Sequence, residues 1–143
     1  MSRSKERSGS PVVLVAAEEW DVLRMVRDVL RRKGFVVIPA RSGQEVVHLA
    51  RAKHPSLILM EIMMPLLDGY AAARVLRRDA ATCCIPIIAF HAPHRFSGRT
   101  GRPRSDGAGD ALTQSEERTL LDRIRQALDA RQASSAYGYG IAR

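Results

Sequence analysis

Short apolar segments alternate with amphipathic segments along most of the chain. Four apolar runs have the length of buried strands. They are Val12–Val15, Phe35–Ile38, Leu57–Met60 and Pro86–Phe90, and we expect Pro39 to end the second. Apolar residues recur at helical spacing between them. The predicted helices are Trp20–Lys33 with Gly34 at its C-cap, Ser42 to about Ala52, and Gly69 or Tyr70 to about Arg78. This alternation predicts a parallel sheet with helices on both faces.

The alternation stops after the fourth predicted strand. Residues 91–107 read HAPHRFSGRTGRPRSDG, and their prolines and glycines predict a loop in place of a helix. Asp110–Thr113 predicts a weak fifth strand. A capping box at Thr113 and Glu116 then starts a final helix. We expect one domain over 11–131, with a disordered basic tail at 1–10 and a flexible tail at 132–143.

Charge and length narrow the class of protein. The chain has 143 residues, 45% of them hydrophobic, and a formal net charge of +8. These values suit one globular domain. No apolar run approaches the roughly 20 residues that cross a bilayer, and the N-terminus lacks the apolar core of a secretory signal, so we expect a cytoplasmic protein. The positive net charge favours acidic partners or nucleic acid, although a solvated basic surface is the simpler interpretation.

The cysteines predict neither a disulfide nor a metal site. Cys83 and Cys84 are adjacent, and a bond between neighbours strains the intervening peptide. His91 and His94 follow one strand later, which gives four residues of the types that bind zinc. The close Cys-x-x-Cys spacing of a structural zinc site is missing. We therefore expect no metal centre.

The third predicted strand ends in a carboxylate, Glu61, followed by Met63-Met64-Pro65 and then Asp68-Gly69. A carboxylate at the tip of a buried strand lies where α/β proteins place their sites. This segment resembles the phosphoacceptor strand and loop of bacterial response-regulator receiver domains. The resemblance covers residues 11–131 and implies a doubly wound, five-stranded parallel sheet in the order 2-1-3-4-5. The family's fourth helix would be missing or replaced by the loop at 91–107.

Receiver domains transfer a phosphoryl group from a histidine kinase to their own aspartate, with the help of an acidic pair that binds Mg²⁺, a hydroxyl residue and a lysine. By resemblance, these positions fall on Ala17, Glu18, Glu61, His91 and Gln114. Ala17 has no carboxylate, and Glu61 reaches one methylene further than aspartate. His91 is too large to act as the hydroxyl, and Gln114 lacks the charge of lysine. The pattern predicts a pseudo-receiver that is not an enzyme and binds Mg²⁺ weakly or not at all.

The sequence leaves two interpretations of Glu61 open. In the first, its carboxylate lies near the position of a phosphoryl oxygen, with Gln114 and His91 as hydrogen-bond partners, and fixes the domain in one signalling state. In the second, the carboxylate points to solvent and has no role.

The resemblance predicts a stand-alone bacterial signalling module that acts by protein–protein interaction without phosphorylation. The alternatives are a phosphorylatable response regulator that uses Glu61, or a small basic nucleic-acid-associated protein. Few aromatic residues interleave the basic ones, so nucleic acid is the weaker prediction. The expected partners are signalling proteins of acidic character, and the oligomeric state stays open. Candidate partner-binding residues are Trp20, Arg95, Phe96, Arg99, Arg102 and Arg104. Trp20 has a second interpretation, packing against the Pro65 loop.

Overall fold

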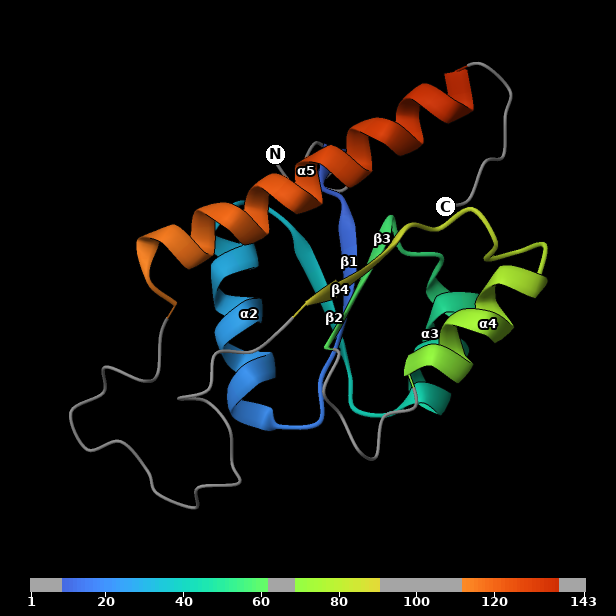
Figure 1. Ribbon diagram of the computed structural model, residues 1–143, viewed down its shortest axis with the longest axis horizontal. Helices are drawn as coiled ribbons and strands as arrows, with labels where there is room; N and C mark the ends of the chain where they lie inside the picture. Colours follow the sequence, from blue (N-terminus) through green and yellow to red (C-terminus); the bar gives the residue numbers. More distant parts are fainter. Residues whose placement is uncertain (1–8, 62–68, 91–111, 137–143) are drawn as a thin grey trace, which may run out of the picture.

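A parallel sheet lies at the centre of the computed structural model, which describes residues 9–61, 69–90 and 112–136 (Figure 1). Its described strands run in the order β2-β1-β3-β4. They are β1 (Val12–Ala16), β2 (Val36–Ala40), β3 (Leu57–Glu61) and β4 (Ile87–Phe90). The helices are α2 (Trp20–Arg32), α3 (Gly43–Lys53), α4 (Gly69–Arg78) and α5 (Gln114–Ala136). This order confirms the predicted topology for the four strands.

The fifth predicted strand cannot be placed in the same way. Residues 110 and 111 lie outside the described part of the chain, and Leu112 and Thr113 are not in a strand. The loop at 91–107, the question of a helix there, and most of the N-terminal tail also lie outside the described residues.

The predicted C-terminal tail needs a correction, because α5 continues to Ala136. Its last turns contain Gln132 and alanines, which favour a helix.

The prediction that Pro39 ends the second strand is wrong. Pro39 lies inside β2, in register with Val15. The Val36 N–H donates to the Pro11 carbonyl at 3.0 Å, and the Ala17 N–H donates to the Ala40 carbonyl at 3.1 Å. Alternate residues of a strand point their backbone N–H and C=O groups to opposite sides. Val36 and Ala40 point these groups toward β1, so the backbone groups of Pro39 point away from β1. In the described sheet β2 is an edge strand, where a missing N–H costs no ladder hydrogen bond.

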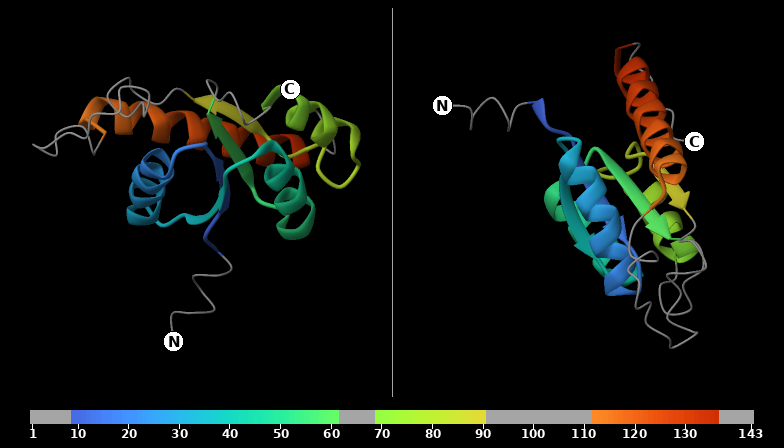
Figure 2. Two further views of the ribbon diagram at one scale, coloured as in Figure 1. Left: turned by 90° about the horizontal axis from the view of Figure 1, so that it is seen from below. Right: turned by 90° about the vertical axis from the view of Figure 1, so that its left-hand side faces the viewer.

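Two side-chain layers cover the two faces of the sheet. Val13 and Val15 of β1 pack with α2 and α5 on one face, whereas Leu14 and Ala16 pack with α3 and α4 on the other. Figure 2 shows the sheet and the helices around it from two further directions. The alternation follows from the two-residue period of a strand. Because both faces are covered, β1 is apolar along its whole length, as expected for a buried parallel strand.

The predicted helix ends rest on specific caps. The Phe35 N–H donates to the Leu30 carbonyl and the Gly34 N–H to the Arg31 carbonyl. With Gly34 at φ +92°, these bonds form a Schellman motif. The Ser42 hydroxyl accepts from the Glu45 N–H at 3.1 Å. Thr113 and Glu116 form the full reciprocal capping box at the start of α5, with distances of 3.1 and 2.8 Å.

One contact ties the far end of α5 to the sheet. The Arg131 guanidinium donates to the Ser56 carbonyl at 2.7 Å and to the Pro55 carbonyl at 3.3 Å. These carbonyls directly precede β3, the strand that ends in Glu61. None of the helices in the described residues is both long and apolar enough to cross a membrane.

Candidate functional site

The carboxyl ends of β1 and β3 bring two of the predicted pocket residues to one edge of the sheet. Ala16 of β1 pairs with Met60 of β3. The next residue along each strand, Ala17 and Glu61 respectively, therefore lies at the same edge of the sheet. Glu61 in turn pairs with Phe90, the last residue of β4. Because the strands are parallel, the loops that follow them all leave from this edge. The structure therefore places Glu61 at the tip of a fully buried strand, as the sequence predicts.

The Glu61 side chain is buried, with only 8% of its surface exposed. It is one of two buried polar or charged residues in the described structure, the other being Thr82. A buried carboxylate is costly unless it is hydrogen-bonded or paired. The solvent-facing interpretation of Glu61 therefore disagrees with the structure.

Ala17 belongs to the hydrophobic core. Its side chain is fully buried in the cluster formed by β1, β3, α2 and α5, and its N–H donates to the Ala40 carbonyl. The Ala17 side chain therefore supplies a methyl group in place of a carboxylate that could bind a hard cation. Its neighbour Glu18 is partly exposed in the loop before α2.

Arg41 is a site residue that the sequence analysis missed. It follows β2 directly, and its Nε and Nη2 donate to the Glu18 carbonyl at 3.0 and 2.6 Å. Its guanidinium carbon lies 4.6 Å from the centre of the Trp20 ring, in a cation–π contact. The Arg41 N–H donates to Glu45 Oε1 at 2.6 Å. The available signal was the position of Arg41, shortly after a predicted strand and directly before Ser42, where the next helix is predicted to start.

Trp20 is 56% exposed, as predicted for a residue near the pocket mouth. It contacts Arg41, and its alternative contact, the Pro65 loop, lies outside the described residues. Gln114 is exposed at the first position of α5. The remaining predicted site residues also lie outside the described part of the chain. They are His91, Arg95, Phe96, Arg99, Arg102 and Arg104.

The cysteines lie in the turn between α4 and β4. Both are free thiols, with 3.7 Å between the sulfur atoms. The hydrogen-bonding contact with Cys84 raises the pKa of the Cys83 thiol. Among the residues that the structure describes, no three His, Cys, Asp or Glu side chains come close enough to hold a metal ion together.

Removing the Arg41 side chain should loosen the start of α2. We expect Arg41→Ala to lower the free energy of unfolding by about 1–2 kcal/mol, because two hydrogen bonds and a cation–π contact are lost. Urea unfolding followed by Trp20, the only tryptophan of the chain, measures this. Arg24→Ala is the matched control. Its contact with Asp21 is exposed and 3.7 Å long, so it should change the free energy by less than about 0.5 kcal/mol. Equal effects of the two substitutions would contradict a specific role for Arg41.

The doubly wound sheet and the carboxylate at the carboxyl end of its third strand agree with the fold that the resemblance implies. The profile described as "Response regulator receiver domain" matches residues 13–129, and the chain belongs to this family. Protein PilH of Pseudomonas aeruginosa is 38% identical over 117 residues, which is 81% of this chain and 96% of PilH. The polar-differentiation response regulator DivK of Brucella abortus is 39% identical over 81 residues, or 57% of this chain and 65% of DivK.

Solved structures agree with this assignment. A putative response regulator from Chloroflexus aurantiacus has a TM-score of 0.64 and 26% identity, over 84% of this chain and 98% of that one. The receiver domain of sensor histidine kinase PA1611 from Pseudomonas aeruginosa has a TM-score of 0.63 and 26% identity, over 85% of this chain and 99% of that one. That structure has a magnesium ion coordinated in its active-site cleft.

Proposed function

We propose that this chain is a pseudo-receiver, a signalling module that works by protein–protein interaction without phosphorylation at Glu61. The observation that carries this proposal is the burial of Ala17 beside the end of β3. A methyl group packed into the core stands where the family resemblance places half of the metal-binding carboxylate pair. Without that carboxylate, the charge of a transferring phosphoryl group loses part of its compensation.

Magnesium binding should be weak or absent for a second reason. The Arg41 guanidinium lies against the Glu18 carbonyl, in the loop that would face the metal. Like charges repel, and the repulsion is stronger near a protein surface than in bulk water. The PA1611 receiver domain shows that a structural relative holds magnesium in its cleft. The donor set described for this chain, with Ala17 and Arg41 in place, is a poor fit to that ion.

The buried carboxylate of Glu61 also supports a fixed signalling state. A side chain that is only 8% exposed is held by its surroundings. A carboxyl group held at the tip of β3 would occupy the part of the pocket that phosphorylation fills in a switching receiver. The proposed output is then constant and depends on binding to a signalling partner.

Acetyl phosphate with Mg²⁺ tests the proposal, with intact mass as the measurement. We expect the natural chain to gain no phosphoryl group, because both the acceptor geometry and the metal site are altered. Glu61→Gln serves as the matched variant. A phosphoryl adduct on the natural chain that is missing from Glu61→Gln would instead establish a phosphorylatable regulator that uses Glu61.

A further inference from the structure

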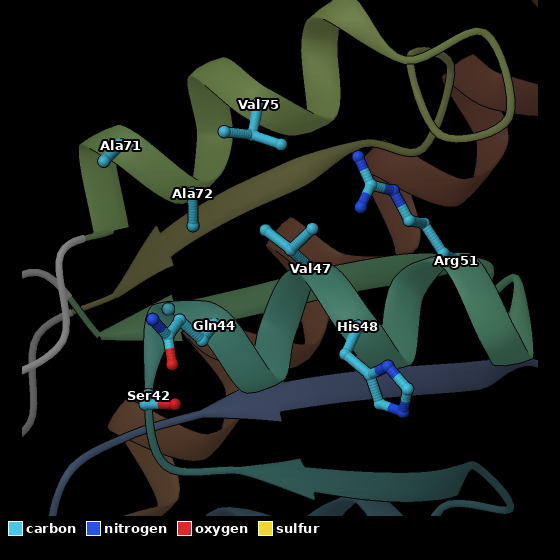
Figure 3. A pocket seen from close by; sticks show the side chains of 9 residues that line it. Ser42, Gln44, Val47, His48, Arg51, Ala71, Ala72 and Val75 are labelled. Atoms are coloured by element: carbon cyan, nitrogen blue, oxygen red, sulfur yellow. The ribbon is translucent and has the colours of Figure 1, made fainter.

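A groove lies between α3 and α4, on the sheet face opposite α2 and α5 (Figure 3). Its volume is 630 Å³, within the usual range of ligand pockets. Val47, Ala71 and Val75 give it an apolar lining, and Gln44, His48 and Arg51 supply polar groups. Val75 is 42% exposed, which is unusual for a valine on a helix of this small domain. We call this surface the α3–α4 groove.

The two helices that form the groove are strongly basic. Helix α4 carries Arg74, Arg77 and Arg78 and has no acidic residue. Helix α3 carries Arg51 and Lys53 against a single carboxylate. That carboxylate, Glu45, already accepts a hydrogen bond from the Arg41 N–H. Of these basic side chains only Arg51 lines the groove, and Arg77 donates to the Cys83 and Ile85 carbonyls. An occupant of the groove therefore meets apolar surface with Arg51 beside it, on two helices whose summed charge is positive.

Charge disfavours two of the possible occupants. A second copy of this chain has the same net charge of +8 and would be repelled. Of the segments of this chain outside the folded elements, residues 1–8, 91–111 and 137–143 are net basic, and residues 62–68 carry a single acidic side chain, Asp68. Residues 1–8 carry three basic side chains and one acidic side chain, and residues 137–143 carry Arg143 and no acidic residue. The complementary occupant is an acidic segment of another protein.

We propose that the α3–α4 groove binds an acidic amphipathic helix of a partner protein. A helix fits a groove between two helices, because its ridges pack between theirs. The small side chains of Ala71 and Ala72 allow a close approach, while Val47 and Val75 offer apolar contact. An apolar lining suits a helix better than a phosphate backbone. This inference rests on the proposed function and names the surface and the class of partner through which it acts.

Arg51 is already oriented for this role. Its Nε donates to Asp79 Oδ2 at 2.7 Å. Asp79 also accepts from the Ala81 N–H at 2.9 Å, and these two contacts lower the pKa of its carboxyl group, the backbone contact more than Arg51. Asp79 therefore stays charged and holds the guanidinium at the groove. The Nη atoms carry further N–H groups that can donate to a carboxylate of the partner.

Two designed helical peptides test the proposal by NMR titration of the ¹⁵N-labelled full chain. Both peptides have the same apolar face of Leu and Ala, and one carries Glu and the other Lys on its polar face. We expect the Glu peptide to shift the amide signals of α3 and α4 and the Lys peptide to leave them unchanged.

Two exposed valines provide a matched pair of variants. Val75→Gln should weaken binding of the Glu peptide by about tenfold, because apolar contact in the groove is lost. Val36 is 47% exposed on β2 and does not line the groove, so Val36→Gln should leave the affinity unchanged. Equal affinities of the two variants, or shifts confined to other elements, would overturn the proposal. A DNA duplex that shifts the same amides more strongly than the Glu peptide would assign the groove to nucleic acid instead.

The groove and the proposed function can fail separately. If the Glu peptide does not bind in the groove and acetyl phosphate gives no adduct, only the groove assignment is lost. If acetyl phosphate gives an adduct that Glu61→Gln abolishes, phosphorylation independence is lost whatever the peptide does.

Discussion

Restoring the four altered pocket positions together should convert this chain into a receiver that accepts one phosphoryl group from acetyl phosphate. The substitutions are Ala17→Asp, Glu61→Asp, His91→Thr and Gln114→Lys. They return the missing metal carboxylate, the shorter acceptor, the small hydroxyl and the fixed positive charge that the chemistry needs. Intact mass after incubation with acetyl phosphate and Mg²⁺ measures the effect, and the expected change is from no adduct to one.

Two controls make this result specific. Glu61→Asp alone should stay unmodified, because a shorter acceptor without the metal carboxylate leaves the phosphoryl charge uncompensated. The fourfold variant with Asn in place of Asp at position 61 should also stay unmodified, since it has lost the acceptor. A folded fourfold variant without an adduct would show that these four positions do not account for the lost chemistry.

The burial of Ala17 adds a measurable consequence to the same variant. Its side chain is fully buried, so a carboxylate introduced there loses hydration unless a cation compensates it. We therefore expect the fourfold variant to melt at a lower temperature than the natural chain in the absence of Mg²⁺. Mg²⁺ should raise its melting temperature, because a ligand that binds only the folded state stabilises it. The natural chain should melt at the same temperature with and without Mg²⁺.

The strands, helices and layers of this fold could be predicted because they depend on local patterns, whereas the strand order was implied by the resemblance to receiver domains. The apolar run of β1 and the stripe of α2 identify core positions without knowledge of their partners. Gly34 and Ser42 are local signals as well, and each forms the predicted cap. Pro39 was misinterpreted because the cost of a proline depends on whether its strand lies at an edge, which is a tertiary property.

The candidate site could be predicted only in part, because some of its contacts depend on tertiary structure, as the cost of Pro39 does. Glu61 was found because it ends an apolar run that leads into a loop, and Ala17 was found because the resemblance places half of the acidic pair there. The contact of Arg41 with Glu18 and Trp20 joins segments more than 20 residues apart, and no local pattern reports it. The α3–α4 groove likewise depends on how two helices pack. A single amphipathic pattern shows which side of each helix is apolar, but not how much of that side the neighbouring helix leaves uncovered.

The largest stability effect should come from Ile124, which anchors α5 to the sheet. Ile124 is fully buried in the cluster that includes Val13, Leu59 and Phe90, so it joins the final helix to β1, β3 and β4. Truncation to alanine removes apolar contact and leaves a cavity, which costs about 2–5 kcal/mol in comparable cores. A second contact ties the start of α5 to the end of α2, because the Arg32 guanidinium donates to Glu117 Oε2 at 2.9 Å.

Chemical unfolding of Ile124→Ala, followed by Trp20 fluorescence and circular dichroism, gives the change in unfolding free energy. Arg125→Ala is the matched control on the same helix. Arg125 is exposed and alanine favours a helix, so this change should alter the free energy by less than about 0.5 kcal/mol. The slope of free energy against denaturant should be the same in both variants, since neither changes the surface exposed on unfolding by much. A loss below about 1 kcal/mol for Ile124→Ala would mean that α5 contributes little to the core.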